Sequence, residues 1–413
     1  MQAATPSVRV LMLSHYFAQH QGGIEAVAAA LARELSARGF QVMWLASGDP
    51  GCDGEQCAYR RISLPAASVI ERRLAIPYPL LRPSAWRTIF RESAYQDVIV
   101  VHDALYMSSI LGYLAARLRR KPLVVVQHVG FVPFRSAPLR TLMRLANRWI
   151  AVPLLRGAEQ VIFISHLTLR HFSNVRWRRP PALVFNGVDT DIFRPAADTA
   201  QIESERRRLG LPAQAVIALF VGRFVEKKGL QCLEHLARQC AEVLFVFAGH
   251  GPLDPRGWRL PNVRVYTGLG GAQLAALYRA SDVLLLPSTG EGFPLVVQEA
   301  LACGLAIICG SDTASADERA AGLLRGVAVD PADPAATAVR VREELTRILG
   351  RVRPQAERNV RSAFARASYS WNASGTRYAE ILRELCASPS AHGATLARLD
   401  GNPSGVVDAT EKE

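Results

Sequence analysis

Two glutamates eight positions apart, Glu291 and Glu299, frame the most informative window of this chain, which reads STGEGFPLVVQEA. An apolar run precedes the window and a proline follows the glycine turn, so the pattern predicts a strand, a tight turn and a helix N-terminus. Glycine lets a backbone approach a ligand, and the first turn of a helix attracts an anion, ideally a phosphate. We therefore predict that Gly292, Phe293 and Leu295 bind a ligand at this turn.

The surroundings of the two glutamates suggest different partners. Glutamates in general are solvated surface acids. The segment FPLVVQEALACG is apolar nearly all round, so Glu299 should be buried and should have a partner. Glu291 lies in the turn beside the expected anion, whereas Glu299 lies more than one helical turn later, within reach of hydroxyl groups.

A second loop with chemical potential, GRFVEKKG, follows the apolar run 216–221 and holds two of the chain's four lysines. Because the chain uses arginine almost everywhere else, two lysines in one loop are hard to explain as generic surface charge. A forked guanidinium and a compact ammonium five positions apart, Arg223 and Lys228, predict a clamp for a diphosphate. A solvated loop is the alternative, but it would not need a glycine at both ends.

The first half of the chain offers weaker candidates. Gly22 and Gly23 close a loop directly before a helical pattern, where backbone N–H groups can meet a phosphate or a sugar. The loop does not match the dinucleotide-binding motif G-x-G-x-x-G. A glycine pair is also common before helices that bind no ligand. His128 ends another expected strand beside Gly130; a lone histidine is more often a packing residue, but a strand's carboxyl end favours a site.

Apolar runs and helical patterns alternate in both halves of the chain, separated by a polar, proline-containing passage at 174–199. Two consecutive βαβ arrays imply two doubly wound parallel sheets of the α/β class facing a cleft, with ligands bound outside the carboxyl ends of the strands. The expected strands are 8–14, 42–47, 98–101, 123–127, 161–165, 216–221, 243–248, 263–267, 283–286 and 306–309. The expected helices are 24–38, 230–240, 272–280 and 294–303.

Composition limits the class of protein. The chain has 413 residues, 49% hydrophobic and 21% charged, and is long enough for two or more cores. No apolar stretch reaches the roughly 18 residues of a membrane span, and the N-terminus passes from polar residues into a strand-like run rather than a secretory signal. Seven scattered cysteines suggest a reducing compartment, so we expect a cytoplasmic protein.

The net charge of +13 requires an acidic partner, for which nucleic acid, an anionic membrane and a phosphorylated substrate all qualify. Basic residues gather with apolar and aromatic ones in 60–87 and 131–156. In the second stretch Arg140, Arg144 and Arg148 fall on a different helical face from the apolar residues, which is typical of a helix at a membrane interface. A core-facing helix with a solvated basic face is the alternative. The apolar positions are Leu139, Leu142, Met143, Leu145, Ala146, Trp149 and Ile150.

Taken together, the motifs resemble those of a known family. In chain order they are Gly22-Gly23, NGVDTDIF, GRFVEKKG, FAGHGP and EGFPLVVQE followed by ALACG. Over roughly residues 8–385 the chain resembles the family 4 retaining glycosyltransferases, which have the GT-B fold of two Rossmann-like domains facing a cleft. The implied parts are an acceptor-side domain at 1–185, a nucleotide-sugar domain at 186–365, a helix at 366–387 crossing back to the first domain, and a disordered tail at 388–413.

The resemblance implies a role for each matching residue of the second domain. Arg223 and Lys228 would neutralise the donor diphosphate as it leaves, and Glu299 would hold the ribose hydroxyls. Glu291 would contact the transferred sugar and help to stabilise positive charge at its anomeric carbon. The chain departs from the common pattern at Pro294, where the family often has glycine, and this removes one N–H that could bind phosphate.

In the first domain, His128 matches the family's histidine near the donor sugar. Gly23, beside Gly22, matches the backbone contact that places donor against acceptor. No metal or other cofactor is expected, because the chain has no clustered acidic metal motif and Cys52 and Cys57 have no second pair at metal spacing. Two cations and a helix N-terminus can stabilise the leaving diphosphate electrostatically. The departing phosphate is expected to accept the acceptor's proton.

The implied activity is retaining transfer of a hexosyl group from a nucleoside-diphosphate sugar to a glycan or lipid-linked acceptor, in cell-surface polysaccharide or glycolipid synthesis. The basic stretches suggest work at the cytoplasmic face of an anionic membrane. One alternative is a nucleotide-sugar epimerase of similar fold. Another is a catalytically silent protein that binds membrane or nucleic acid. A nucleic-acid partner is not expected, since the chain lacks a dense basic tract with stacked aromatics.

Overall fold

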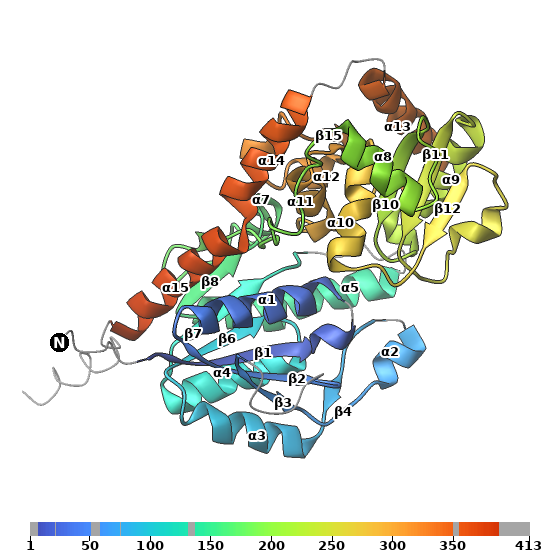
Figure 1. The fold of residues 1–413 in the computed structure, drawn as a ribbon. Coiled ribbons are helices and arrows are strands. Elements are labelled where there is room, and N and C mark those ends of the chain that lie inside the picture. The colour runs from blue at the N-terminus through green and yellow to red at the C-terminus, as the bar shows by residue number, and fades with distance from the viewer. Residues whose placement is uncertain are drawn as a thin grey trace, which may run out of the picture.

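The computed structural model describes residues 7–20, 22–50, 58–74, 76–130, 137–349 and 355–387. The expected disordered tail at 388–413 and the thiols Cys52 and Cys57 lie outside the described residues. The chain forms two α/β lobes, one above the other in Figure 1, and each is built on its own parallel sheet. The predicted fold class, α/β with two doubly wound Rossmann-like domains, is confirmed.

The first sheet has seven parallel strands in the order β3-β2-β1-β6-β7-β8-β9. Its central strands are apolar and buried on both faces, as expected of a parallel sheet covered by helices. The strands are β1 (Arg9–Tyr16), β2 (Gln41–Ser47), β3 (Arg60–Ser63), β6 (Val98–His102), β7 (Leu123–Gln127), β8 (Gln160–Phe163) and β9 (Ala182–Leu183); a separate hairpin pairs β4 (Ala66–Ala67) with β5 (Leu80–Leu81).

Alternate residues of β1 enter different core layers, as the two-residue period of a strand requires. The helices of this lobe are α1 (Gly23–Ala37), α2 (Val69–Leu74), α3 (Pro83–Ser93), α4 (Met107–Arg119), α5 (Ala137–Ala146), α6 (Val152–Gly157) and α7 (His166–His171), with short turns η1 (Ala18–His20) and η2 (Asn147–Ala151). Val10 and Met12 pack with α1 and the last helix of the chain, whereas Leu11 and Leu13 pack with α3, α4 and α6.

The second sheet has six parallel strands in the order β12-β11-β10-β13-β14-β15. The strands are β10 (Val216–Val221), β11 (Val243–Ala248), β12 (Val263–Tyr266), β13 (Val283–Leu286), β14 (Ala306–Gly310) and β15 (Arg325–Val327). The helices are α8 (Thr199–Arg208), α9 (Leu230–Gln239), α10 (Gly271–Ala280), α11 (Leu295–Ala302), α12 (Ser311–Ala314) and α13 (Pro334–Leu349), with short turns η3 (Glu226–Lys228), η4 (Pro255–Trp258) and η5 (Glu318–Ala320).

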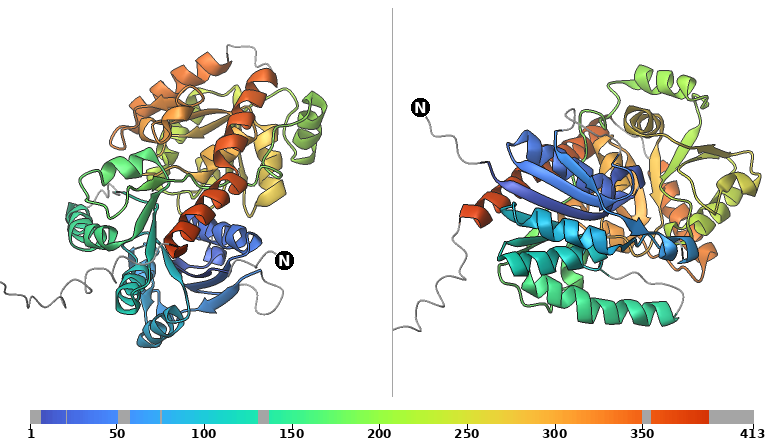
Figure 2. Two further views of the ribbon diagram at one scale, coloured as in Figure 1. Left: turned by 90° about the vertical axis from the view of Figure 1, so that its left-hand side faces the viewer. Right: turned by 90° about the horizontal axis from the view of Figure 1, so that it is seen from below.

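The chain ends by returning to the first lobe, as predicted. Helix α14 (Gln355–Tyr369) packs on α11, and α15 (Trp371–Ala387) then runs onto α1, which is clear in the left view of Figure 2. The Arg38 guanidinium on the loop after α1 donates to the Asn372 side chain over 2.8 Å. The consecutive helices α14 and α15 therefore connect the two lobes.

The strands and helices predicted from the apolar patterns agree with the structure to within two residues at each end. The crossing helix, predicted at 366–387, begins only at Trp371, because α14 ends at Tyr369. One difference concerns Pro294, which was expected to be the first helical residue. Its backbone is extended, with φ −63° and ψ 136°, so the helix begins at Leu295 and the proline is its N-cap residue. In the part of the chain that the structure describes, no helix combines the length and apolar character that crossing a bilayer requires.

Candidate active site between the two domains

The strand order of each sheet reverses once, and that is where α/β sheets bind ligands. The reversal lies between β1 and β6 in the first sheet and between β10 and β13 in the second. The loop after β10 carries Arg223 and Lys228, and the loop after β13 carries Glu291. Strand order therefore brings together residues that are more than sixty positions apart in the sequence.

Two lysines and one glutamate form a charge cluster at the second reversal. Lys228 Nζ lies 3.2 Å from Glu291 Oε2, and Lys227 Nζ lies 3.3 Å from Glu291 Oε1. Burial raises the pKa of the Glu291 carboxyl, but Lys228 and Lys227 outweigh this effect and hold it below its usual value. Burial lowers the pKa of Lys228, and Glu291 opposes that shift. Sequence reasoning placed Lys228 here but missed the contribution of Lys227.

Arg223 is exposed at the start of the same loop. Burial raises the pKa of the Tyr106 phenol in the loop after β6; Asp103 and Glu25 raise it further, while the charge of Arg223 lowers it. Arg223 is therefore close enough to act electrostatically on the opposite domain. Of the two predicted clamp residues, Lys228 is paired with Glu291, and the charge of Arg223 acts on both Lys228 and Tyr106.

Glu299 has the partner that its buried setting required. Its Oε2 accepts a hydrogen bond of 2.8 Å from the Tyr278 hydroxyl on α10. Burial raises the pKa of Glu299 to about 7, and the bond from Tyr278 only partly opposes this. The carboxyl is thus poised between its neutral and charged forms near neutral pH, and no sequence motif indicated Tyr278 as its partner.

The turn that contains Glu291 packs directly on the first lobe. A Cβ added to Gly292 would lie 2.6 Å from the His128 carbonyl oxygen, so only glycine allows this approach. Gly290, at φ 67°, makes the tight turn. Phe293 is buried beside Phe185 and Tyr369, so only its backbone is available to a ligand, and Leu295 begins the helix.

His128 is buried at the end of β7 and is paired with a second histidine. Its Nε2 lies 3.0 Å from Nδ1 of His102, which ends the neighbouring strand β6. Burial lowers the pKa of His128 to about 3 and also lowers that of His102, so both rings are neutral at physiological pH. A neutral His128 can exchange hydrogen bonds with sugar hydroxyls but carries no charge.

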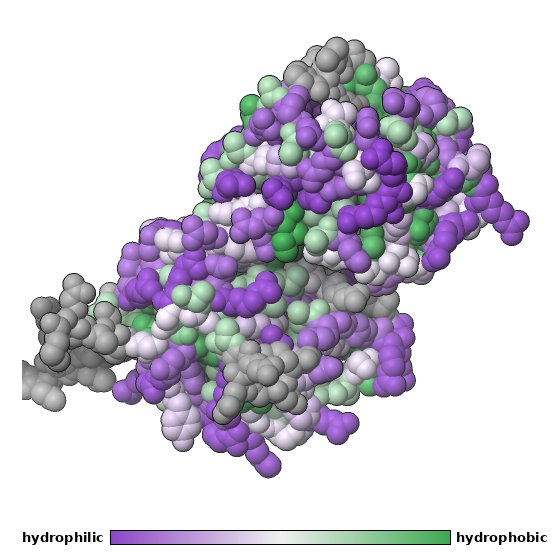
Figure 3. Space-filling model, in the orientation of Figure 1, coloured by the Kyte–Doolittle hydropathy of each residue, from purple (hydrophilic) through white to green (hydrophobic). Residues whose placement is uncertain are grey.

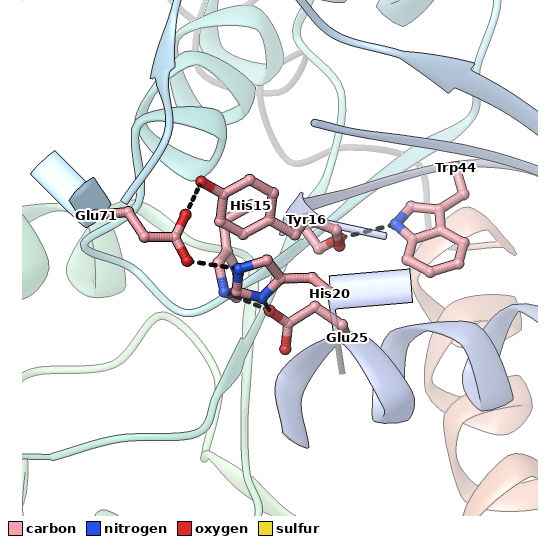
Figure 4. Close-up of polar contacts among 7 residues, drawn as sticks. His15, Tyr16, His20, Glu25, Trp44 and Glu71 are labelled. Carbon is pink, nitrogen blue, oxygen red and sulfur yellow. Dashed lines mark hydrogen bonds and ion pairs between the residues drawn. The ribbon is translucent and has the colours of Figure 1, made fainter. Parts of the chain in front are cut away.

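A network of histidines and carboxylates lies at the first reversal, in the loop between β1 and α1 (Figure 4). Glu25 Oε1 lies 3.0 Å from His15 Nε2 and 3.1 Å from His20 Nδ1. His20 Nε2 in turn lies 2.7 Å from Glu71 Oε1 on α2, and the Tyr16 hydroxyl donates to Glu71 Oε2 over 2.6 Å. The network ties the first loop to helix α2.

Geometry makes His20 a cation. Each of its ring nitrogens faces a carboxylate oxygen, which can only accept a hydrogen bond, so both nitrogens must carry a proton. The hydrogen bond to Glu25 raises the pKa of His20 most; burial opposes the rise, and Glu71 adds to it. Burial also raises the pKa of Glu25, but the bonds from His15 and His20 reverse this and leave it lowered.

The glycine pair occupies an unexpected setting. A Cβ on Gly22 would collide with the Glu25 carboxylate, which folds back over the N-terminus of α1, whereas a Cβ on Gly23 would meet nothing within 4 Å. Gly22 is therefore required for the position of Glu25, and Gly23 begins the helix. The carboxylate takes the place at the helix N-terminus that we expected a phosphate to occupy.

The close spacing of histidines and a glutamate could have predicted this network, but in this loop we considered only the glycine pair. Three of its members, His15, His20 and Glu25, fall within eleven residues after the apolar part of β1. Glu71 could not be found in this way, because it reaches the loop from a helix in a different part of the chain. Within the described ranges, no group of three or more histidines, cysteines and acidic residues is arranged to hold a metal ion.

Two family profiles match this chain one after the other. The profile "Glycosyltransferase Family 4" matches residues 21–192, and "Glycosyl transferases group 1" matches residues 201–347. A relative from Xylanimonas cellulosilytica, named D-inositol 3-phosphate glycosyltransferase, is 30% identical over 364 residues, which cover 77% of this chain and 82% of the relative.

Solved structures share the fold. Sucrose-phosphate synthase from Thermosynechococcus elongatus superposes with a TM-score of 0.73 at 20% identity, covering 92% of this chain and all of that one. Anabaena Alr3699/HepE, solved with UDP, superposes with a TM-score of 0.67 at 18% identity over 91% of this chain and all of that one. With both profiles matched in order and a close relative covered over most of its length, this chain belongs to the family 4 glycosyltransferases.

Proposed function

We propose that this glycosyltransferase moves a hexosyl group, with retention of anomeric configuration, from a nucleoside-diphosphate sugar to a glycan or lipid-linked acceptor. The observation that carries the proposal is the cluster of Lys227, Lys228 and Glu291 at the strand-order reversal, held against the His128 carbonyl by Gly292. Anabaena Alr3699/HepE, which shares the fold, has been solved with UDP and with UDP-glucose, and this supports the choice of donor class.

In the proposed reaction the bond between the anomeric carbon and the diphosphate oxygen breaks, and a bond to the acceptor oxygen forms on the same face. The acceptor's proton passes to the leaving diphosphate. Arg223 and Lys228 stabilise the charge that develops there, and preorganised cations at such a position contribute strongly to catalysis. We propose that neither a metal nor another cofactor takes part.

Glu291 would change partners when the donor binds. Without a ligand its carboxylate neutralises two lysines. A diphosphate, with more negative charge, competes for the same ammonium groups, and Glu291 is then available to the transferred sugar. Glu299 would accept the ribose hydroxyls, with Tyr278 holding the carboxylate in place. His128 would hydrogen-bond the donor sugar from the first lobe, and the main chain at Gly22 and Gly23 would separate donor from acceptor.

The acceptor lies on the side of the first lobe, which we propose as a domain at 1–185, with the nucleotide-sugar domain at 186–365 and the crossing helix at 366–387. We propose that the enzyme works in the cytoplasm, at the inner face of the membrane, in polysaccharide or glycolipid synthesis. The relatives are named for an inositol phosphate acceptor, which is a useful first compound to test against glycans and lipid-linked sugars.

A screen of nucleotide sugars tests the proposal. Each candidate, beginning with UDP-glucose, is incubated with the protein, and release of nucleoside diphosphate and thermal stabilisation are measured. A donor at 100 times its dissociation constant stabilises the fold by about 2.7 kcal/mol. Label from the donor sugar should appear in a larger product; label found only in an isomeric nucleotide sugar would instead establish an epimerase, and no stabilisation by any donor would reject the site.

A further inference from the structure

Three consecutive helical segments of the first lobe form one continuous rod. Helix α5, the turn η2 and helix α6 follow one another without a break from Ala137 to Gly157, and they lie along the lower edge of the right view of Figure 2. Pro153 lacks the N–H that would bond the Trp149 carbonyl, and the backbone widens into a π-helical turn just before it. Such turns occur often at functional sites.

Ala151, Leu154 and Leu155 of this rod pack into the core, but a second set of apolar side chains on α5 and η2 does not. Leu142 and Trp149 expose 61% and 68% of their surface, and Leu145 and Ile150 are also exposed. The alternative of a core-facing helix is therefore wrong for these four residues. On the face seen in Figure 3 the strongly apolar residues are instead separated from one another by hydrophilic ones. We call Leu142, Leu145, Trp149 and Ile150 the apolar ridge. A group of exposed apolar side chains like this one marks an interaction surface.

Arginines gather beside the ridge in a hollow of about 490 Å³. Arg144, Arg148 and Arg156 line it, with His171 and Asn147. Among the residues that the structure describes, these three arginines form no ion pair with a carboxylate. By contrast, Arg170 and Arg178 of the same lobe each pair with a glutamate. Uncompensated guanidinium groups around an open hollow fit a phosphate group.

The net positive charge of the chain is concentrated in the sequence segment that includes the rod. Residues 104–188 contain thirteen arginines and lysines but a single acidic residue, Glu159. The rest of the chain is nearly balanced, with 36 basic and 35 acidic residues. Almost all of the net charge of +13 therefore belongs to the part of the first lobe that includes the rod. A surface that is both strongly basic and apolar is complementary to an anionic bilayer.

We propose that the α5–η2–α6 rod docks the enzyme on an anionic bilayer. Trp149, Leu142 and Leu145 enter the interface, and the arginine hollow binds the phosphate of a lipid headgroup. Aliphatic side chains gain free energy by leaving water for lipid, whereas they contribute nothing to phosphate contacts along a nucleic acid. The ridge thus favours a bilayer over nucleic acid. The inference rests on the proposed function, for which it names the docking surface.

The rod is connected to the active site. The Asn147 side-chain amide in η2 donates to the Gly130 carbonyl over 3.2 Å. Gly130 lies two residues after His128, whose carbonyl meets Gly292 of the donor domain. A bilayer bound at the rod would therefore lie beside the acceptor side of the site, where a lipid-linked acceptor has a short path from the membrane to the donor.

Co-sedimentation of the full chain with vesicles tests the docking surface. Vesicles of phosphatidylcholine alone are compared with vesicles containing about one third phosphatidylglycerol, at low and high salt. We expect enrichment on the anionic vesicles only, weakened by salt. The double variants Trp149→Ala with Leu142→Ser, and Arg144→Gln with Arg148→Gln, should each lower the partition coefficient at least tenfold.

Matched controls lie on α14 of the other lobe, where Val360→Ser and Arg366→Gln remove an exposed apolar residue and an exposed arginine. Both should partition like the wild type. Equal partition of wild type and rod variants, or tighter binding of the wild type to a DNA or RNA oligonucleotide than to anionic vesicles, would overturn the proposal.

Donor-dependent stabilisation, measured in the same preparations without vesicles, should be unchanged in the rod variants. That measurement separates failure at the docking surface from failure of the proposed transferase function.

Discussion

Lys228 and Glu291 lie with Nζ and Oε2 3.2 Å apart where the strand order of the second sheet reverses, although 63 positions separate them in the chain. The pair carries the charges that a nucleotide-sugar donor needs, but without a ligand each group neutralises the other. Lys227 binds the same carboxylate from the opposite oxygen. Removing Lys228 therefore leaves Glu291 with one cation, and the variant should keep its fold.

Replacement of Lys228 or Arg223 by alanine should lower kcat at least tenfold if each cation stabilises the leaving diphosphate as we propose. Tenfold corresponds to about 1.4 kcal/mol in the activation barrier. Turnover of the donor identified by the screen is measured alongside circular dichroism to check folding. Lys121→Ala, two residues before β7 and thus at the opposite end of that strand from His128, is the control and should turn over normally. Wild-type rates in both clamp variants would reject the clamp.

Stability should depend on pH through Glu299. Its pKa is about 7 in the folded protein, above the usual 4.5, so the folded state binds more protons than the unfolded state between these values. The free energy of unfolding without a ligand should therefore fall as pH rises from about 4.5 to 7, by up to about 1.4 kcal/mol per pH unit. Urea denaturation across this range measures the slope, and Glu299→Gln should remove that contribution.

A methyl group at Gly292 should push the two domains apart where the Gly292 turn meets His128. The Cβ of Gly292→Ala would lie 2.6 Å from the His128 carbonyl oxygen, so the turn or the neighbouring loop must move. Overpacking of this kind costs about 1–3 kcal/mol. We expect a lower melting temperature and at least tenfold lower turnover. Gly322→Ala, where a Cβ meets nothing within 4 Å, serves as control; equal melting curves for both variants would contradict the contact.

The His20 cation should respond to removal of one of its two carboxylates. Because its pKa is raised above 6.5 in the folded state, its contribution to stability is complete below pH 6.5 and is lost as pH rises through the raised value. In Glu71→Gln a neutral amide replaces the carboxylate, and the His20 pKa should fall. NMR titration of the His20 ring protons follows this directly; an unchanged pKa would mean that Glu71 does not act on His20.

Continuous apolar runs were sufficient to predict the strands of both sheets, because a parallel strand buried on both faces is apolar at nearly every position. Runs such as 216–221 and 243–248 are strands with the predicted ends. Pro294 shows the limit of such reasoning: its fixed φ suits either the first helical residue or the residue before it, and only its observed ψ of 136° distinguishes them. Residues 137–151 were ambiguous for a related reason, since an amphipathic pattern does not say what its apolar face contacts.

The sequence by itself determined the class of fold, the two arrays of strands and helices, and the motif residues Arg223, Lys228, Glu291 and Glu299. Only the tertiary structure decided their partners. It paired Glu291 with both lysines, Glu299 with Tyr278 and His20 with Glu71. The physical reason is that strand order and helix packing, rather than distance along the chain, determine which charged groups share a low-dielectric site, and their pKa values follow from those neighbours.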